Sequence, residues 1–492
     1  TMLFLGFSAG VPILLIFSTL SIWLREAEMA RATITFFSWA ALGYSFKFVW
    51  APLVDKLPLP VLTARLGRRR AWLLVSQFSV IVAILWMAGN DPTANLTLTA
   101  MAAIMLGFSS ATQDIVIDAY RIESAGPDLQ AMMASSYIAG YRIGMLAAGA
   151  GTLYLAAYFA TGKTYDYPSW SLAYACMAAV MLVGVATTLV IAEPEIHRPT
   201  GSAFANTGHN LRFFAVFLCA AAAFAAAFFL SADMVKAVKS AFVEDLSMTK
   251  GLAGFLVETV RLAFAAGLGG IVGWALVAAR AVPAAMVVEG YIDPMADFVR
   301  RYGKLAILIL ALIGTYRVAD IVMGAVANLF YFDLGFTKEQ IALYSKTYGL
   351  FATIAGSFLG GVLAVRYGVI RALFLGALLA AASNLLFAYM ATQGKDATLL
   401  MAVIMADNIS AGMATAAFVA YLSSLTSVSF TAMQYAIFSS VMTLFPKILA
   451  GYSGMMVDSL DYGPFFVLTA ALGIPVVFLV AWVGKAIPVE RD

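Results

Sequence analysis

Apolar runs of about twenty residues recur along the whole sequence, and this is the length that a helix needs to cross the roughly 30 Å hydrocarbon core of a bilayer. Only 12% of the 492 residues are charged, whereas the share in soluble domains is about 25%. The sequence therefore predicts an all-α polytopic membrane protein of about fourteen transmembrane helices. The expected spans lie near residues 2–24, 34–54, 71–89, 97–120, 132–160, 170–192, 211–231, 252–282, 304–329, 340–365, 372–391, 398–425, 432–456 and 464–486.

The basic residues of the loops predict the orientation of the chain in the membrane. Lys56, Arg65, Arg68, Arg69 and Arg70 crowd the link between the second and third spans, whereas the link around NDPTANL has no lysine or arginine. Loops rich in lysine and arginine stay on the cytoplasmic side. We therefore expect the first link and both termini to be cytoplasmic.

A loop pattern that occurs twice indicates an internal repeat. The second span ends in APLVDKLPLPVLTARLGRRRAW and the tenth ends in GSFLGGVLAVRYGVIRAL, and in each a helix is followed by a turn with glycine and arginine. Two six-helix halves are the simplest interpretation. We expect these halves at residues 1–195 and 300–490, with a pair of additional helices inserted at 205–290.

The sequence offers no catalytic or metal-binding cluster. Its two histidines, His197 and His209, both follow the sixth span, and its two cysteines, Cys176 and Cys219, lie in separate apolar stretches. An enzyme would need a nucleophile with a base or a set of metal ligands, so we expect no enzyme, no metal and no cofactor. The short basic clusters lack the long basic face that nucleic acid requires. We expect a monomer whose partners are the bilayer, a solute and protons.

The fourth span carries two aspartates within SATQDIVIDAYRIE. Asp114, Asp118 and Arg121 lie at i, i+4 and i+7, so they share one face of the helix, with Gln113 beside it. A charge at the bilayer centre costs about 2.5 to 3.5 kcal/mol on insertion scales, so this face should line a cavity. Asp114 lies about a turn deeper, and we expect it to bind and release protons. Asp118 with Arg121 forms either a cytoplasmic gate or part of the proton-coupling site.

Two arginines lie inside other spans, Arg142 in AGYRIGML and Arg317 in TYRVADIV. Arg317 is expected to form an ion pair with Asp320, one turn away on the same helix. Arg142 either pairs with an aspartate of the fourth span, Asp114 or Asp118, or contacts the substrate.

Two lysines also lie inside spans, Lys47 in GYSFKFVW and Lys346 in YSKTYGLF. Neither has a carboxylate within reach on its own helix, which favours contact with an anionic substrate. Tyr44 and Tyr141 flank such cations and are candidates for stacking on sugar rings, although aromatic residues at helical spacing also serve as packing.

The second half adds polar residues in its later spans. Asp407 and Asn408 lie in MADNISAGMATAAF, Gln434 lies in TAMQYAIFSS, and Lys447 follows a proline in LFPKILAGYSG. A proline inside a span frees backbone carbonyls. We therefore predict that these residues line the cavity or form its gate.

Several strings, taken in order, resemble the AmpG family of muropeptide permeases, in the peptide/acetyl-coenzyme A transporter group of the major facilitator superfamily. They are LGFSAGVP, FKFVWAPLVD, GRRRAWLL, SATQDIVIDAY, GYRIGML, SKTYGLFATIAG and ASNLLF. The resemblance runs through nearly the whole chain except residues 200–295. It implies import of anhydro-muropeptides, which are sugar-peptide fragments of peptidoglycan, across the bacterial inner membrane with the proton gradient.

The resemblance also implies roles for individual residues. In the family, the paired aspartates of the fourth span are linked to protons, and they match Asp114 and Asp118. The loop motif of the superfamily latches the cytoplasmic face with an acidic residue and arginines, and here Asp55, Arg68 and Arg69 match it. The second copy of this motif lacks the aspartate.

The sequence leaves other functions open. A related carrier would move acetyl-coenzyme A, a siderophore or a small peptide by the same alternating access of two halves around a midplane cavity. A membrane sensor that binds a solute without transporting it would also explain charged residues inside the spans.

Overall fold

The structure is a computed structural model that describes residues 1–29, 37, 42–162, 165–195, 203–245, 248, 250–450 and 453–486. The chain forms two compact units. The larger unit joins Thr1–His197 with Asp297–Asp492, and the smaller unit is Arg198–Ala296.

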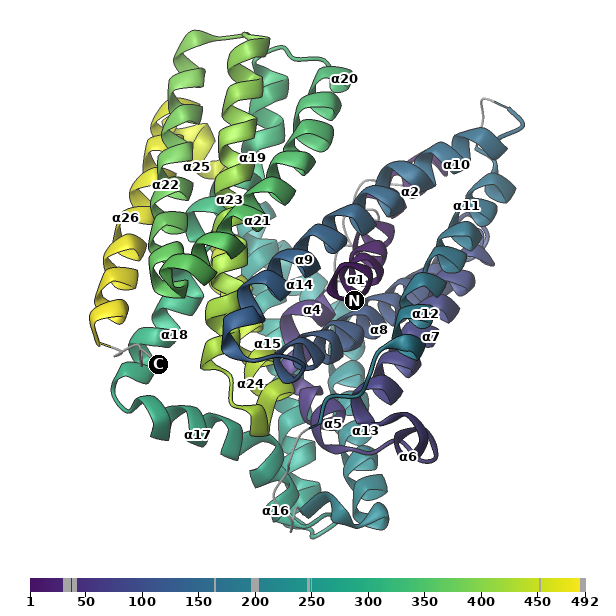
Figure 1. The fold of residues 1–492 in the computed structure, drawn as a ribbon. Helices are drawn as coiled ribbons and strands as arrows, with labels where there is room; N and C mark the ends of the chain where they lie inside the picture. The colour runs from purple at the N-terminus through teal and green to yellow at the C-terminus, as the bar shows by residue number, and fades with distance from the viewer. Residues whose placement is uncertain are drawn as a thin grey trace. The chain divides into compact units, whose positions relative to one another are not determined.

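The first part of the larger unit is a bundle of long helices joined by short turns (Figure 1). Helices α1 and α9 lie side by side, as do α7 and α8. The elements are α1 (Met2–Ile16), α2 (Ser18–Glu26), α4 (Leu42–Phe46), the 3-10 turn η2 (Lys47–Val49), α5 (Ala51–Lys56), α6 (Leu62–Leu66), α7 (Arg68–Ala88), α8 (Leu96–Glu123), α9 (Pro127–Leu146), the π turn η3 (Ala147–Gly151), α10 (Thr152–Phe159), α11 (Tyr167–Val180) and α12 (Leu182–Val190).

The second part of the larger unit repeats this construction. Helices α21 and α23 lie side by side, and α22 packs against α26 (Figure 1). The elements are α17 (Asp293–Tyr302), α18 (Leu305–Thr315), α19 (Val318–Asp333), α20 (Lys338–Ile341), the π turn η6 (Ala342–Tyr348), α21 (Gly349–Tyr367), α22 (Val369–Gln393), α23 (Ala397–Leu425), η7 (Val428–Phe430), α24 (Thr431–Ala450), α25 (Ser453–Leu460) and α26 (Tyr462–Ala486).

The smaller unit is also helical, and its two long helices, α13 and α15, pack against each other. On α15, Arg261 forms an ion pair with Glu258 at 3.1 Å and lies 4.0 Å from the centre of the Phe228 ring. The two long helices are connected through the shorter helix α14. The elements are η4 (Ala203–Ala205), α13 (Thr207–Leu230), α14 (Ala232–Glu244), α15 (Lys250–Ala278), α16 (Ala284–Val287) and η5 (Val288–Ile292).

Twelve helices in the described part of the chain are long and apolar enough to cross a membrane. The expected spans at 34–54 and 132–160 are not among them, so the count of about fourteen is not confirmed. The first begins in residues 34–36 and 38–41, which lie outside the described residues, and continues as α4, η2 and α5. In the second, the π turn η3 separates α9 from α10.

The two copies of the loop pattern adopt the same turn. Gly67 precedes α7 with φ +85° and ψ 170°, and Gly368 precedes α22 with φ +89° and ψ 151°. This is a conformation that glycine adopts readily and other residues rarely do. The matching backbone explains why both copies of the repeat have a glycine at this position.

Glycines bring the backbones of neighbouring helices into contact. A Cβ atom on Gly6 would overlap the carbonyl oxygen of Tyr137, and one on Gly140 would overlap the carbonyl oxygen of Leu3. Gly356 gives α21 the same close approach to α23. Because lipid supplies no hydrophobic drive between helices, such close packing is a main source of their association.

We predict that Gly140→Ala destabilises the protein by roughly 1–3 kcal/mol, the usual cost of overpacking. The added methyl group would displace α1 from α9, because it meets backbone atoms that cannot move aside alone. Gly151→Ala is the matched control, since nothing lies within 4 Å of its added Cβ. The measurement is thermal unfolding of both purified variants in detergent, and equal midpoints for the two would contradict the packing argument.

Candidate functional site

Helix α8 positions the charged face that the sequence predicts. Asn95 caps its first turn, where the side-chain oxygen accepts a hydrogen bond from the Leu98 amide at 3.1 Å. Near the other end, Asp114, Asp118 and Arg121 are all buried, with at most 8% of each residue exposed. A polar face with so little exposure must find its partners within the protein.

Asp118 lies between two cations from different elements. Its Oδ2 is 3.6 Å from Lys47 Nζ, and its Oδ1 is 3.5 Å from Arg121 Nη2. Lys47 lies on the 3-10 turn η2, so its carboxylate partner comes from a different helix, and its role as a substrate contact stays a prediction. The sequence reasoning considered only carboxylates on the lysine's own helix, whereas this partner comes from α8.

Asp114 lies one helical turn from Asp118 in different surroundings. Its Oδ1 is buried without a hydrogen-bond partner among the described atoms. Tyr44, Tyr137 and Tyr141 surround it closely enough to interact with its charge. Tyr44 itself donates a hydrogen bond to Ser110 at 2.5 Å. A buried carboxylate with an incompletely satisfied oxygen, among hydroxyl groups, is well suited to hold a proton.

Gln113 points from α8 towards α1. Its Nε2 donates a hydrogen bond to Ser8 Oγ at 2.7 Å, and the residue has no exposed surface. Its side-chain oxygen is buried without a partner in the described structure. The structure thus places this amide in the packing between two helices, and its role as a substrate contact stays a prediction.

Arg142 does not bind Asp114 or Asp118, so the ion pair considered from the sequence is wrong. Its Nη1 lies 3.9 Å from Met145 Sδ, and within the described residues no carboxylate oxygen lies within 4.0 Å of it. Instead it lies near Arg317 and Asp320 of the second half. A guanidinium near another guanidinium leaves room for an anion from outside the protein.

Arg317 has the partner that the sequence predicts. It forms an ion pair with Asp320, and its Nη1 donates a hydrogen bond to Thr415 Oγ1 at 2.8 Å. Asp407 lies close to this pair and accepts a hydrogen bond from Ser383 Oγ at 3.1 Å.

Three candidates of the second half remain, Asn408, Lys447 and Lys346, and the contacts described for them do not join them into one cluster. Asn408 Oδ1 accepts a hydrogen bond from Thr353 Oγ1 at 2.9 Å. Lys447 Nζ donates to Ser45 Oγ of the first half at 3.4 Å, and α24 continues as a helix through the preceding proline. The side chain of Lys346 lies outside the described residues.

Gln434 belongs to a polar group near the start of α24. Its Oε1 accepts hydrogen bonds from Arg301 Nη2 at 3.0 Å and from the Ser427 amide at 2.7 Å. Its Nε2 donates to Asp297 Oδ2 at 2.9 Å, and Arg301 also forms an ion pair with Asp297. These contacts connect α17 to α24. Gln434 therefore takes part in helix packing, which the sequence did not predict.

Arg69 is the centre of a second buried charge cluster. Its Nη2 is 2.8 Å from Asp55 Oδ1 and 3.0 Å from Thr431 Oγ1, and it also forms an ion pair with Glu123. Glu123 in turn accepts a hydrogen bond from Thr431. The sequence predicts both Arg68 and Arg69 for the latch, and it is Arg69 that forms these bonds.

The Arg69 cluster joins the two halves, because Thr431 begins α24. Two further contacts do the same: Arg121 Nη1 donates to Ser423 Oγ at 2.7 Å, and Ser135 Oγ donates to the Ser357 carbonyl at 2.8 Å. The helix ends involved adjoin the loops expected on the cytoplasmic side. Sequence reasoning missed Glu123, Ser423 and Thr431, since no local pattern marks a partner three hundred residues away.

Glu193 fixes the start of α7 from the end of the first half. Its two carboxylate oxygens accept hydrogen bonds from the backbone amides of Arg69 at 2.8 Å and Arg70 at 3.0 Å. A carboxylate at a helix start satisfies free amides and complements the helix dipole. It thereby holds the Arg69 side chain in register with its partners.

The chain is similar to known transporters. The family described as "Acetyl-coenzyme A transporter 1" matches residues 1–160. A Rickettsia felis protein named "Putative transporter AmpG 4" is 29% identical over 485 residues, 99% of this chain and 96% of that protein. The "Anhydromuropeptide permease" of Escherichia coli K12 is 27% identical over 475 residues, 96% of this chain and 77% of that protein.

Solved structures show the same fold. The major facilitator superfamily transporter FucP, in the outward conformation, matches with a TM-score of 0.62 at 10% identity and covers 98% of this chain and 97% of its own. At this identity the likeness establishes the all-helical major facilitator fold alone.

We predict that Arg69→Gln destabilises the protein by about 3–5 kcal/mol, because it removes the guanidinium that forms ion pairs with the buried carboxylates of Asp55 and Glu123. Thermal unfolding in detergent measures the loss. Arg70→Gln is the control, since Arg70 is only partly buried and binds backbone carbonyls of α12. A midpoint for Arg69→Gln as high as that of Arg70→Gln would contradict the role of the cluster.

Proposed function

The chain belongs to the AmpG/acetyl-coenzyme A transporter family of the major facilitator superfamily, and from this premise we propose that it imports anhydro-muropeptides with protons. It is a transporter and not an enzyme. The observation that carries the proposal is the buried face of α8, where Asp118 has two cationic partners and Asp114 has none within ion-pair distance in the described structure.

Asp114 is proposed as the proton carrier and Asp118 as the group that responds to it. Lys47 is bound to Asp118 and also lies close enough to Asp114 to interact with its charge. When Asp114 loses its proton, Lys47 is drawn towards a second carboxylate, and when Asp114 is protonated, this attraction ends. Protonation of Asp114 thus alters the strength of the Lys47–Asp118 ion pair, which connects η2 to α8. This change in turn acts on the conformation of the first half.

The proposed substrate contacts are the cations that remain available. Arg142 has no carboxylate partner within the described residues, and Lys447 has a serine as its hydrogen-bond partner. Stem-peptide carboxylates would give both an ionic partner, and the hydroxyl groups of Tyr44 and Tyr141 would suit the saccharide. This arrangement supports a substrate that is both acidic and rich in hydroxyl groups.

Transport is proposed to proceed by alternating access of the two halves, residues 1–195 and 300–490. The Arg69 cluster and the Arg121–Ser423 bond would form the cytoplasmic gate in its closed state. In that state the cavity opens to the periplasm. Import requires these bonds to break, so the free energy of substrate and proton binding must offset them.

The proposed location is the bacterial inner membrane, with fourteen crossings and both termini in the cytoplasm. This proposal adds residues 34–54 and the α9–α10 segment to the twelve apolar helices as two further crossings. Labelling of single cysteines from either side of the membrane tests it. An external label at residue 64, in the Lys56–Arg70 loop, would overturn this orientation.

Acetyl-coenzyme A is the second candidate substrate, because the family of that name matches residues 1–160. It too is anionic, so the free cations suit it as well. The two are separated by uptake of labelled anhydro-muropeptide into energised vesicles with each compound as competitor. Uptake of labelled acetyl-coenzyme A without uptake of labelled anhydro-muropeptide would overturn the proposed substrate, and binding without any flux would indicate a sensor.

We predict that Asp114→Asn strongly reduces uptake driven by a proton gradient but leaves exchange of substrate at equal pH unchanged. Coupling free energies of about 1–3 kcal/mol imply a fall of roughly 5- to 150-fold in gradient-driven accumulation. Asp128→Asn, an exposed aspartate in the first turn of α9, is the control. Full accumulation by Asp114→Asn would remove this residue from the coupling mechanism.

We predict that Arg142→Gln raises the KM for muropeptide uptake with little change in proton coupling. The loss of one charged hydrogen bond costs about 1.5–3 kcal/mol, a change of roughly 10- to 150-fold. Substrates whose stem carboxylates are amidated should lose much less, because they lack the charge that Arg142 binds. An equal rise in KM for both substrates would show that the variant disturbs the cavity in general.

A further inference from the structure

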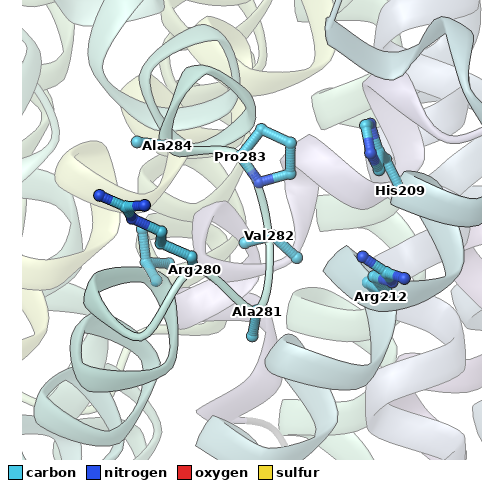
Figure 2. A pocket seen from close by; sticks show the side chains of 8 residues that line it. His209, Arg212, Arg280, Ala281, Val282, Pro283 and Ala284 are labelled. Carbon is cyan, nitrogen blue, oxygen red and sulfur yellow. The ribbon is translucent and has the colours of Figure 1, made fainter.

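The smaller unit contains a pocket of about 420 Å³ that lies away from the charged face of α8 in the sequence. It is lined by the first two turns of α13 and by the loop between α15 and α16, including His209, Arg212, Arg280, Val282 and Pro283. Figure 2 shows His209 and Arg212 along one helix, with Arg280 on the loop across from them. The pocket is therefore built from two segments about seventy residues apart in the sequence.

The pocket is basic, and no acidic residue lines it. Arg212 and Arg280 are both exposed, and neither has an ion-pair partner among the residues that the structure describes. Elsewhere in this unit several charges are paired, as in Arg261 with Glu258 and Lys236 with Asp233. Two arginines and a histidine around one cavity give an anion several donors at once.

The pocket lies where the two long helices of this unit leave the apolar region. Helix α13 begins at Thr207 and the neighbouring α15 ends at Ala278, so both meet the same membrane boundary there. One turn inward, Leu211 is 70% exposed and Trp274 is 72% exposed. Exposed apolar side chains on spanning helices face lipid, and tryptophan favours the headgroup level.

The backbone around Arg280 holds this cation in an unfavourable conformation. Arg280 has φ +60°, in the left-handed region that costs a residue with a Cβ about 1–2 kcal/mol and that glycine adopts freely. Strain of this kind is often retained where a side chain has a function. The first amides of α13 are not free to bind an anion, because Asn206 Oδ1 accepts hydrogen bonds from Gly208 and His209. An anion must therefore rely on the side chains.

We propose that this pocket binds the phosphate-bearing headgroup of an anionic phospholipid. Arg212 and Arg280 contact the phosphate, His209 contacts the polar part of the headgroup, and the acyl chains lie along the exposed apolar faces of α13 and α15. The orientation expected from the loops puts the pocket on the cytoplasmic side, where basic pockets between helices hold such headgroups. The inserted helix pair then has a defined lipid ligand of its own, independent of the transported solute.

The test uses the full chain purified in detergent and titrated with phosphatidylglycerol or with phosphatidylcholine of the same acyl chains. Native mass spectrometry counts the lipid retained. We expect preferential retention of phosphatidylglycerol, weakened about fivefold by each of Arg212→Gln and Arg280→Gly. Arg280→Gly also relieves the left-handed strain, so it should unfold no earlier than the unmodified protein. Loss of binding in a protein of equal or higher thermal stability separates binding from folding.

Arg371→Gln is the matched control, because Arg371 is an exposed arginine at the start of α22 and lies outside the pocket. It should retain phosphatidylglycerol as the unmodified protein does. Equal retention of both lipids by the unmodified protein, or equal loss in the control and the pocket variants, would overturn the site. Inorganic phosphate at constant ionic strength should displace the lipid no better than chloride. Efficient displacement by phosphate would identify a site for free phosphate instead.

Discussion

A charge that is buried away from water must have a partner, and the Arg69 cluster is where the larger unit depends most on this constraint. Its guanidinium group is held by Asp55, Glu123 and Thr431. These residues lie on α5, α8 and α24, so one side chain fixes the meeting point of helices from both halves. Glu193 secures the start of α7 and thereby the position of Arg69 itself.

The two aspartates of α8 have different surroundings although they are one turn apart. Asp118 interacts with Lys47 and Arg121, whereas one oxygen of Asp114 has no partner in the described structure. Arg142 is the cationic counterpart, because no carboxylate oxygen of the described residues lies within 4.0 Å of it, although Asp320 is near. An incompletely satisfied acid and base are costly to keep unless a ligand completes them. The interior of the larger unit therefore contains charged groups, Asp114 and Arg142, whose interactions a bound ligand would complete.

Much of the fold is predictable because lipid imposes a simple rule on helix length and composition. The charged face of α8 and the Arg317–Asp320 pair follow from helical spacing, since their members lie on one helix. The partner of Lys47 does not, because its carboxylate comes from a distant helix through the tertiary fold. Thr431 is missed for the same reason. Local pattern identifies which residues need partners, and packing decides which partners they find.

The 3-10 turn η2 has a geometric consequence for the ion pair between Lys47 and Asp118. A 3-10 helix turns about 120° and rises about 2.0 Å per residue, against about 100° and 1.5 Å for an α-helix. Rewinding the three residues Lys47–Val49 as α-helix would therefore rotate the flanking segments by about 60° and shorten the span by about 1.5 Å. Such a rotation is enough to swing an ammonium group out of contact. A small change in the winding of η2 would therefore move the charge of Lys47 relative to α8.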